Sequence, residues 1–199
     1  MITDTNRFQK SIQRFDEENS KDPNLEVYKD QELSKELLYS IRMTEWLAKV
    51  SPQASVHLQL AARSQHICRW TIPRESYPMD RKGYLLWRTE LKQFHAEKAS
   101  EILEECGNDQ VTIDRVKSLI LKQRIKTDPE SQALEDIVCL VFLEHYFEDF
   151  MAKHEPEKVV SIVRKTWNKM SVSAQKLALS LKLGNESKQL IARALNESG

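Results

Sequence analysis

Apolar residues recur at every third or fourth position along most of the chain, and this spacing places them on one face of an α-helix. The clearest case is residues 30–50, where leucine, isoleucine and tryptophan side chains form one stripe. Residues 137–143 are apolar on almost every face, which predicts a buried central helix. Prolines, glycines and the ends of the stripes limit the predicted helices to about 5–18, 30–50, 52–70, 80–106, 111–124, 130–154, 157–170 and 173 onward, the last with a break near Gly184.

This pattern predicts an all-α fold of about eight helices in a single compact domain, 1–199, and the composition agrees with it. Only four of the 199 residues are glycine, although tight hairpins and phosphate-binding loops both need glycine at positive φ. Neither GxxxxGK[ST] nor GxGxxG occurs, so P-loop and dinucleotide-binding folds are excluded. The chain contains no internal repeat or low-complexity segment.

Charge and cysteine content indicate which partners and which cellular compartment to expect for the protein. The 30 basic and 30 acidic residues balance, which argues against a general binder of nucleic acid or of membrane surfaces. No run of eighteen apolar residues occurs, and the first ten residues lack the apolar stretch of a signal peptide. Cys68, Cys106 and Cys139 are widely spaced and form no CxxC pair, which favours reduced thiols. We therefore expect a cytoplasmic protein with no membrane contact.

Candidate binding chemistry concentrates in residues 63–88, which read RSQHICRWTIPRESYPMDRKGYLLWR. Guanidinium groups suit phosphate and carboxylate, a helix start adds backbone N–H donors, and aromatic rings can stack on a base. The segment therefore predicts a site for an anionic small molecule, a nucleotide or an RNA end. The candidates for contacting this ligand are Arg63, Arg69, Trp70, Arg74, Arg81, Tyr84, Trp87 and Arg88. The alternative is that these arginines pair within the protein, with Glu90, Asp128, Glu135 or Asp136.

A second group of candidates consists of polar residues at positions predicted to be buried. Asp136 lies on the predicted central helix, where an ionised carboxylate needs a partner because its burial costs several kcal/mol. Gln132 lies four residues earlier on the same face. Neutral imidazole and carboxylate are common ligands of zinc, iron and manganese, so His66, His95 and Asp136 are candidate metal ligands. Alternatively, Asp136 pairs with an arginine and the histidines form hydrogen bonds in the core.

The motif KMSVS, residues 169–173, is similar to the KMSKS loop of class I aminoacyl-tRNA synthetases, whose lysines hold the pyrophosphate of ATP. Here Val172 replaces the second lysine, and neither a HIGH motif nor a nucleotide-binding sheet accompanies it. Synthetase activity is therefore not expected. The simpler interpretation is a helix that ends at Met170, followed by a helix capped by Ser171 or Ser173.

Three segments resemble a known family. They are AARSQHICRWTIPRESYPMDRKGYLLWRTELKQFHA, TDPESQALEDIVCLVFLEHYF and KTWNKMS. Together they resemble a family of helical proteins from bacteria, fungi and plants that is classed as a domain of unknown function, DUF4202. The resemblance covers nearly the whole chain, and it implies a helical fold without implying an activity.

A weaker resemblance is to the HD superfamily of all-helical metal-dependent phosphohydrolases and di-iron oxygenases, whose ligands follow the order His, then His-Asp, then Asp. His66, His95 and Asp136 stand in that order on successive predicted helices. The residue after His95 is Ala96 and not Asp, so the usual metal site lacks one ligand. The resemblance implies an HD-like fold and one divalent ion, zinc, manganese or iron, with a metal-free relative as the alternative.

Two functional hypotheses follow. In the first, the protein is a hydrolase of a phosphorylated small molecule or nucleotide. His66, His95 and Asp136 hold an ion that activates water, Arg88 acts with them, and the other arginines, the aromatic rings and Gln132 bind substrate. In the second, the protein is a binding module without catalysis, and the same cluster holds an anionic metabolite, a nucleotide or RNA. A purely structural helical scaffold is a third possibility, and none of these specifies an oligomeric state.

Overall fold

The computed structural model describes residues 4–125 and 127–196. Helices account for most of the chain, so the predicted all-α class is confirmed, with ten α-helices among these residues where about eight were predicted. The chain divides into two compact units, residues 1–124 and 125–199, and each is described by itself. The expectation of a single domain stays a prediction. No helix within the described residues has both the length and the apolar character needed to cross a membrane.

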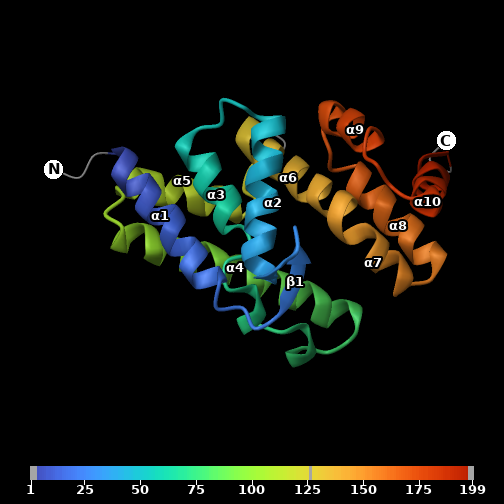
Figure 1. Cartoon of the computed structure of the whole chain (residues 1–199), viewed down its shortest axis with the longest axis horizontal. Coiled ribbons are helices and arrows are strands. Elements are labelled where there is room, and N and C mark those ends of the chain that lie inside the picture. Colours follow the sequence, from blue (N-terminus) through green and yellow to red (C-terminus); the bar gives the residue numbers. More distant parts are fainter. Residues whose placement is uncertain (1–3, 126, 197–199) are drawn as a thin grey trace. The chain divides into compact units, whose positions relative to one another are not determined.

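The first unit consists of α1 (Asp4–Asn19), β1 (Leu25–Tyr28), β2 (Gln31–Ser34), α2 (Lys35–Val50), α3 (Val56–Ser64), α4 (Arg81–Glu105) and α5 (Gln110–Ile120). Helix α3 lies among α1, α2 and α5, and α4 packs along α5 (Figure 1). Its core is formed by fully buried side chains, among them Phe15, Leu38, Met43, Leu60 and Leu119. Because each helix presents one apolar stripe to this core, the periodicity of the sequence predicted most of them.

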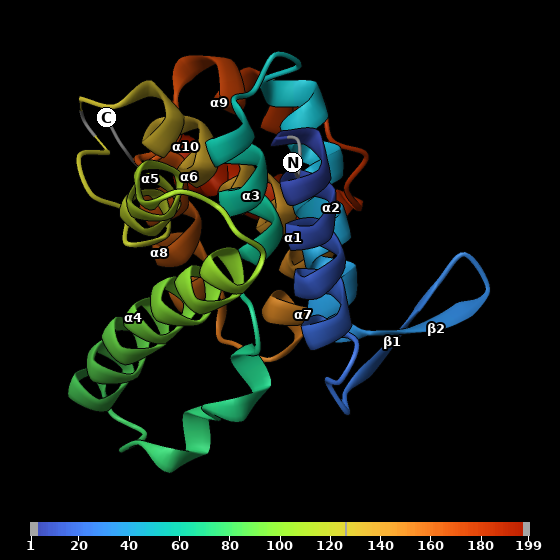
Figure 2. The same ribbon diagram turned by 90° about the vertical axis from the view of Figure 1, so that its left-hand side faces the viewer.

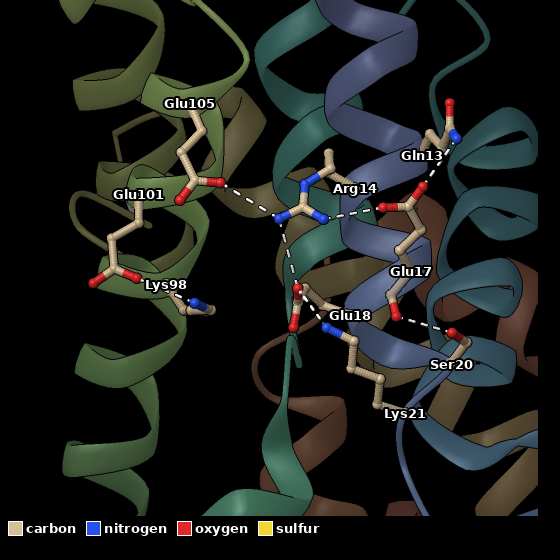
Figure 3. Close-up of polar contacts among 9 residues, drawn as sticks. All are labelled: Gln13, Arg14, Glu17, Glu18, Ser20, Lys21, Lys98, Glu101 and Glu105. Carbon is tan, nitrogen blue, oxygen red and sulfur yellow. Dashed lines mark hydrogen bonds and ion pairs between the residues drawn. The ribbon is translucent and has the colours of Figure 1, made fainter.

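Ion pairs link α1 to its neighbours in the first unit. Arg14 on α1 reaches Glu105 at the end of α4, at 3.4 Å, as Figure 3 shows. Arg63 on α3 donates two hydrogen bonds of 2.7 Å to the carboxylate of Asp16 on α1. Because this second pair is largely shielded from solvent and two-pronged, it contributes more to holding the helices together than the exposed pair.

The predicted helix over residues 30–50 begins later than expected. Residues 25–34 form an antiparallel hairpin in which Glu26 pairs with Leu33, and α2 starts only at Lys35. Lys29 and Asp30 turn the chain with positive φ angles of 50° and 63°, a conformation that suits a two-residue hairpin turn. Figure 2 shows the hairpin projecting from the helices of this unit. The prediction was wrong here because a non-glycine turn carries no strong sequence signal.

The third predicted helix also ends early, at Ser64 and not near Trp70. Cys68 has a positive φ of 52°, which breaks the helix, and 3₁₀ turns at Arg69–Thr71 and Arg74–Ser76 carry the chain toward α4. This connection lies directly against the first turn of α4. A β-carbon at Gly83 would overlap the carbonyl oxygen of Pro78, so only glycine permits this approach.

The second unit consists of α6 (Pro129–Val141), a π-helical segment (Phe142–Tyr146), α7 (Phe147–Ala152), α8 (Pro156–Trp167), α9 (Val172–Leu179) and α10 (Asn185–Asn196). Asp128 caps α6, and Pro129 occupies the first helical position. The predicted break near Gly184 is confirmed, because α9 and α10 are separate helices. Ser171 caps α9 by accepting a hydrogen bond from the Ala174 N–H, so the capping interpretation of KMSVS is also confirmed.

Candidate functional site

The first unit contains a buried cluster of three titratable side chains, which we call the Glu36–His66–His95 cluster. Glu36 lies in the first turn of α2, His66 follows the end of α3, and His95 lies in the middle of α4. The imidazole rings of the two histidines are 5.7 Å apart between centroids. The His66 Nδ1 atom is 3.6 Å from the Glu36 Oε2 atom, which is a close electrostatic contact although longer than a hydrogen bond.

The hydrogen bonding of His95 fixes its tautomer. Its Nδ1 atom lies 2.8 Å from the backbone carbonyl oxygen of Ile67, and a carbonyl can only accept, so Nδ1 carries the proton. Burial lowers the pKa of His95 well below its usual value, and the neighbouring His66 lowers it further. The ring is therefore neutral, and Nε2 carries a lone pair. This Nε2 atom is buried and has no hydrogen-bond donor among the described residues.

His66 is held flat against an aromatic ring and lies closer to solvent. Its imidazole stacks on Tyr39 with ring centroids 4.0 Å apart and planes within 10° of parallel. Its side chain keeps 22% of its exposure, whereas the residue His95 keeps 3%. Removal from water lowers the pKa of His66 well below its usual value, and the positive charges of Arg69, Lys122 and Arg88 add to this effect. Both histidines are therefore neutral at physiological pH.

Glu36 is the carboxyl group of the cluster, and the residue is only 6% exposed. Burial raises its pKa to about 7, and the charge of Arg69, whose Nε lies 3.8 Å from Oε1, opposes this rise. Its Oε2 atom accepts no hydrogen bond from the described residues. Since an unsatisfied buried acceptor costs about 1–3 kcal/mol, two such atoms in one cluster indicate a place for a ligand, an ion or water.

The position of Glu36 is fixed by the buried residue Asp22. The Asp22 carboxylate accepts a hydrogen bond of 3.1 Å from the Glu36 backbone N–H, and it also binds Asn24. The adjacent residue Ser34 does not cap α2, because its hydroxyl donates to the Ser20 carbonyl instead. Asp22 therefore serves as the cap of α2 and holds its first turn in place.

The predicted arginines divide into two groups. Arg63 is bound to Asp16, and Arg74 donates to the carbonyl oxygens of Tyr77 and Pro78 at 3.0 and 2.7 Å. These two therefore hold the protein together, as the internal-pairing alternative proposed, although none of their partners is one of the acids predicted for that role. Arg81 and Arg88 are exposed at the start of α4 and have no ion-pair partner among the described residues.

Two of the predicted aromatic residues, Trp87 and Tyr84, contact arginine side chains. Trp87 is 9% exposed and donates a hydrogen bond of 2.9 Å to the Ile72 carbonyl. The guanidinium carbon of Arg69 lies 4.8 Å from the centre of the Trp87 ring, and that of Arg88 lies 5.7 Å from the centre of the Tyr84 ring. Trp87 therefore supports Arg69 within the protein. Tyr84 is 42% exposed, and Trp70 is partly buried.

Asp136 and Gln132 belong to the second unit. The Asp136 carboxylate accepts hydrogen bonds from the Ser171 backbone N–H at 2.7 Å, from the Ser171 hydroxyl at 2.6 Å and from the Gln132 amide at 3.0 Å. Within the second unit its donors are therefore Ser171 and Gln132, and the alternative pairing with an arginine of residues 63–88 stays a prediction. The shared helix face of Gln132 and Asp136 is as predicted. The predicted convergence of Asp136 with the two histidines stays a prediction.

The predicted metal coordination by His66, His95 and Asp136 stays a prediction. Among residues 4–125 and 127–196, no three His, Cys, Asp or Glu side chains are grouped so as to hold a metal ion.

The sequence analysis missed two residues of the site, Glu36 and Lys122. A signal for Glu36 was present, because it shares its helix face with the buried residues Ser40 and Met43. Lys122 follows the last turn of α5, and no pattern in the sequence marks it.

Comparisons with known proteins identify one family. Residues 9–191 match the family model described as "Domain of unknown function (DUF4202)". The search of curated proteins and the search of solved structures found no match to the chain.

Proposed function

Because the chain belongs to the DUF4202 family, whose description carries no activity, we propose its function from the chemistry of the Glu36–His66–His95 cluster. The proposal is a hydrolase that acts on a phosphorylated small molecule or nucleotide with the help of one divalent ion. The observation that carries it is the buried lone pair of His95 Nε2, which faces no donor among the described residues. The neutral imidazole of His66 lies beside the His95 ring, and the unsatisfied Oε2 atom of Glu36 lies beside His66.

The donor types present suit a divalent ion, although among the described residues they do not form a group of three ligand side chains, so His66 and His95 would be the only protein ligands of the cluster. Two neutral imidazoles and a carboxylate suit zinc, manganese and iron. Two imidazoles that share one zinc ion at about 2.1 Å have ring centroids about 5–6 Å apart, and the observed separation is 5.7 Å. His66 and His95 would hold the ion. Glu36 replaces Asp136 in this proposal, because the Asp136 oxygens already accept three hydrogen bonds.

Each side chain of the cluster has a role in this proposal. A bound divalent ion would lower the pKa of a water molecule and polarise a phosphoryl oxygen. The carboxylate of Glu36, which lies 3.6 Å from the His66 ring, would accept a proton from water in the reaction. Arg69, Arg88 and Lys122 surround His66 with positive charge, which would stabilise the negative charge that develops on a phosphoryl group. Hydrolysis by an HD-like enzyme and a cytoplasmic location belong to this proposal.

The test combines metal analysis with an activity screen. Purified protein is expected to contain close to one zinc, manganese or iron ion per chain by mass spectrometry and to hydrolyse a member of a panel of sugar phosphates and nucleotides. His66→Gln should lose both properties, while His57→Gln, a change at a histidine outside the cluster, should keep both. Wild-type protein with neither metal nor hydrolysis, after loading with each ion, would overturn the proposal. Circular dichroism verifies that each variant is folded.

A second function is favoured by a separate observation, the absence of three grouped ligand side chains among the described residues. In this alternative the protein binds an anionic metabolite, a nucleotide or an RNA end without catalysis, through Arg88, Arg81 and the exposed ring of Tyr84. Protein treated with a chelator should then gain thermal stability with a nucleotide or a short RNA, and Arg88→Ala should abolish the gain. A stabilisation that persists in Arg88→Ala would exclude this surface.

A further inference from the structure

Helix α4 carries its charges in the reverse of the order that favours an isolated helix. Arg81 and Lys82 occupy its first turn, and Glu104 and Glu105 occupy its last turn. The helix dipole places positive charge at the N-terminus and negative charge at the C-terminus, so both pairs are unfavourable where they stand. No ion pair to Lys82 or Glu104 occurs within the described residues.

An exposed stripe runs along the whole of this helix. It consists of Lys82, Leu86, Thr89, Gln93, Glu97, Ser100 and Glu104, whose spacing of three or four residues places them on one face. Most of the stripe is exposed, and Leu86 keeps 51% of its accessible surface. The buried face of α4, which includes His95 and Trp87, lies on the other side. The stripe is therefore open to a partner without disturbing the Glu36–His66–His95 cluster.

The acidic end of the stripe borders a groove. Residues from the second half of α4 and from α5 line a depression of about 310 Å³ that is mostly acidic and polar: Glu97, Ser100, Glu101, Glu104, Gln110, Ile113, Asp114 and Lys117. Near the basic end of the stripe, Leu86 is exposed, and it lies as many residues before Gln93 as Ser100 lies after it. The two ends of the helix are therefore complementary to each other in charge, but they lie on the same rigid helix and cannot meet within one chain.

We propose that a second copy of this chain covers the stripe, with the two α4 helices antiparallel about a two-fold axis at Gln93. This arrangement places Lys82 opposite Glu104 of the second copy, Leu86 opposite Ser100 at the mouth of the groove, and Thr89 opposite Glu97. Because the interface is two-fold, each of these contacts occurs twice. The antiparallel partner also brings opposite dipole ends together, which compensates the unfavourable charges at the two ends of α4.

The length of α4 suits such an interface. A helix of 25 residues is about 37 Å long, and a lengthwise contact of two such helices with their flanking grooves approaches the area of a specific dimer. Charge complementarity favours a second copy as the occupant, because the stripe itself supplies both members of the Lys82–Glu104 pair, which the two-fold axis forms twice. This inference is independent of the proposed hydrolase function.

Sedimentation equilibrium of the full chain tests the proposal. Wild-type protein should dimerise, while Lys82→Glu and Glu104→Lys should each weaken the dimer about tenfold or more, because each change creates two repulsive contacts. The double variant Lys82→Glu with Glu104→Lys should recover most of the affinity, since the reversed charges again attract. Recovery of this kind distinguishes direct pairing from a general effect of charge.

A matched pair of leucine variants provides the control. Leu86→Ser should weaken the dimer, while Leu179→Ser, at a similarly exposed leucine of the second unit, should not. All four positions are exposed, so the variants should fold, which circular dichroism verifies. A monomeric wild type at about 100 µM, a dimer that tolerates both charge reversals, or a double variant as weak as the single ones would overturn the proposal.

Discussion

Replacing Glu36 by glutamine tests the electrostatic description of the cluster through protein stability. The change keeps the size of the side chain and removes only its ability to ionise. In the folded protein burial raises the pKa of Glu36 to about 7, whereas the ordinary value is 4.5. The Glu36 side chain is 8% exposed, so solvent screens this effect little.

The sign and size of the effect follow from this difference in pKa. Below pH 4.5 the carboxyl group is protonated in both states, and it adds no pH dependence. As the pH rises, the unfolded chain loses its proton first, so the folded state loses stability between about pH 4.5 and 7. The full loss at higher pH is about 3 kcal/mol. Wild-type protein should therefore lose about this much stability between pH 4.5 and 8 relative to Glu36→Gln.

Urea unfolding at a series of pH values measures this difference. Groups that titrate alike in both proteins cancel, so the free-energy difference between wild type and Glu36→Gln isolates the one carboxyl group. Glu32→Gln, at an exposed position of the hairpin, serves as the control for the exchange of a carboxyl group for an amide. If the curves for wild type and Glu36→Gln run parallel from pH 5 to 8, Glu36 titrates normally, and the reasoning about its burial is refuted.

Two further predictions concern local packing and capping. Gly83→Ala should destabilise the protein by about 1–3 kcal/mol in urea unfolding, because the new methyl group overlaps the Pro78 carbonyl; an unchanged midpoint would show that the connection moves aside freely. Ser171→Ala should lower the free energy of unfolding by about 1–3 kcal/mol, because it removes a helix cap and one donor to the buried Asp136. Ser173→Ala, at an exposed position, should change the thermal midpoint little. Equal effects of the two changes would show that Ser171 does not cap the helix.

Helix periodicity could predict most of the fold, because each helix buries one apolar stripe. The predicted limits of about 80–106 for the fourth helix agree with α4, Arg81–Glu105, since Asp80 caps its start and Gly107 follows its end at positive φ. The hairpin before α2 escaped prediction because its turn is made by Lys29 and Asp30, which rarely adopt positive φ.

The candidate site was predictable only in part. The sequence places His66 and His95 on separate helices, and the structure brings their rings together because α3 and α4 both pack on α5. Glu36 was not predicted, since a single glutamate on an apolar face carries no sign of its partner. The arginines could not be divided into bound and exposed groups, because the acceptors of Arg74 are backbone carbonyls, which no sequence pattern identifies.

Anomalous diffraction from crystals grown with manganese or zinc tests the central claim most directly. We expect an anomalous peak about 2.0–2.2 Å from His95 Nε2 and within coordination distance of the His66 ring. The peak should vanish in His66→Gln crystals prepared in the same way. Density that shows an ordered water molecule at His95 Nε2 without any anomalous signal, or an ion bound only elsewhere on the chain, would contradict the claim.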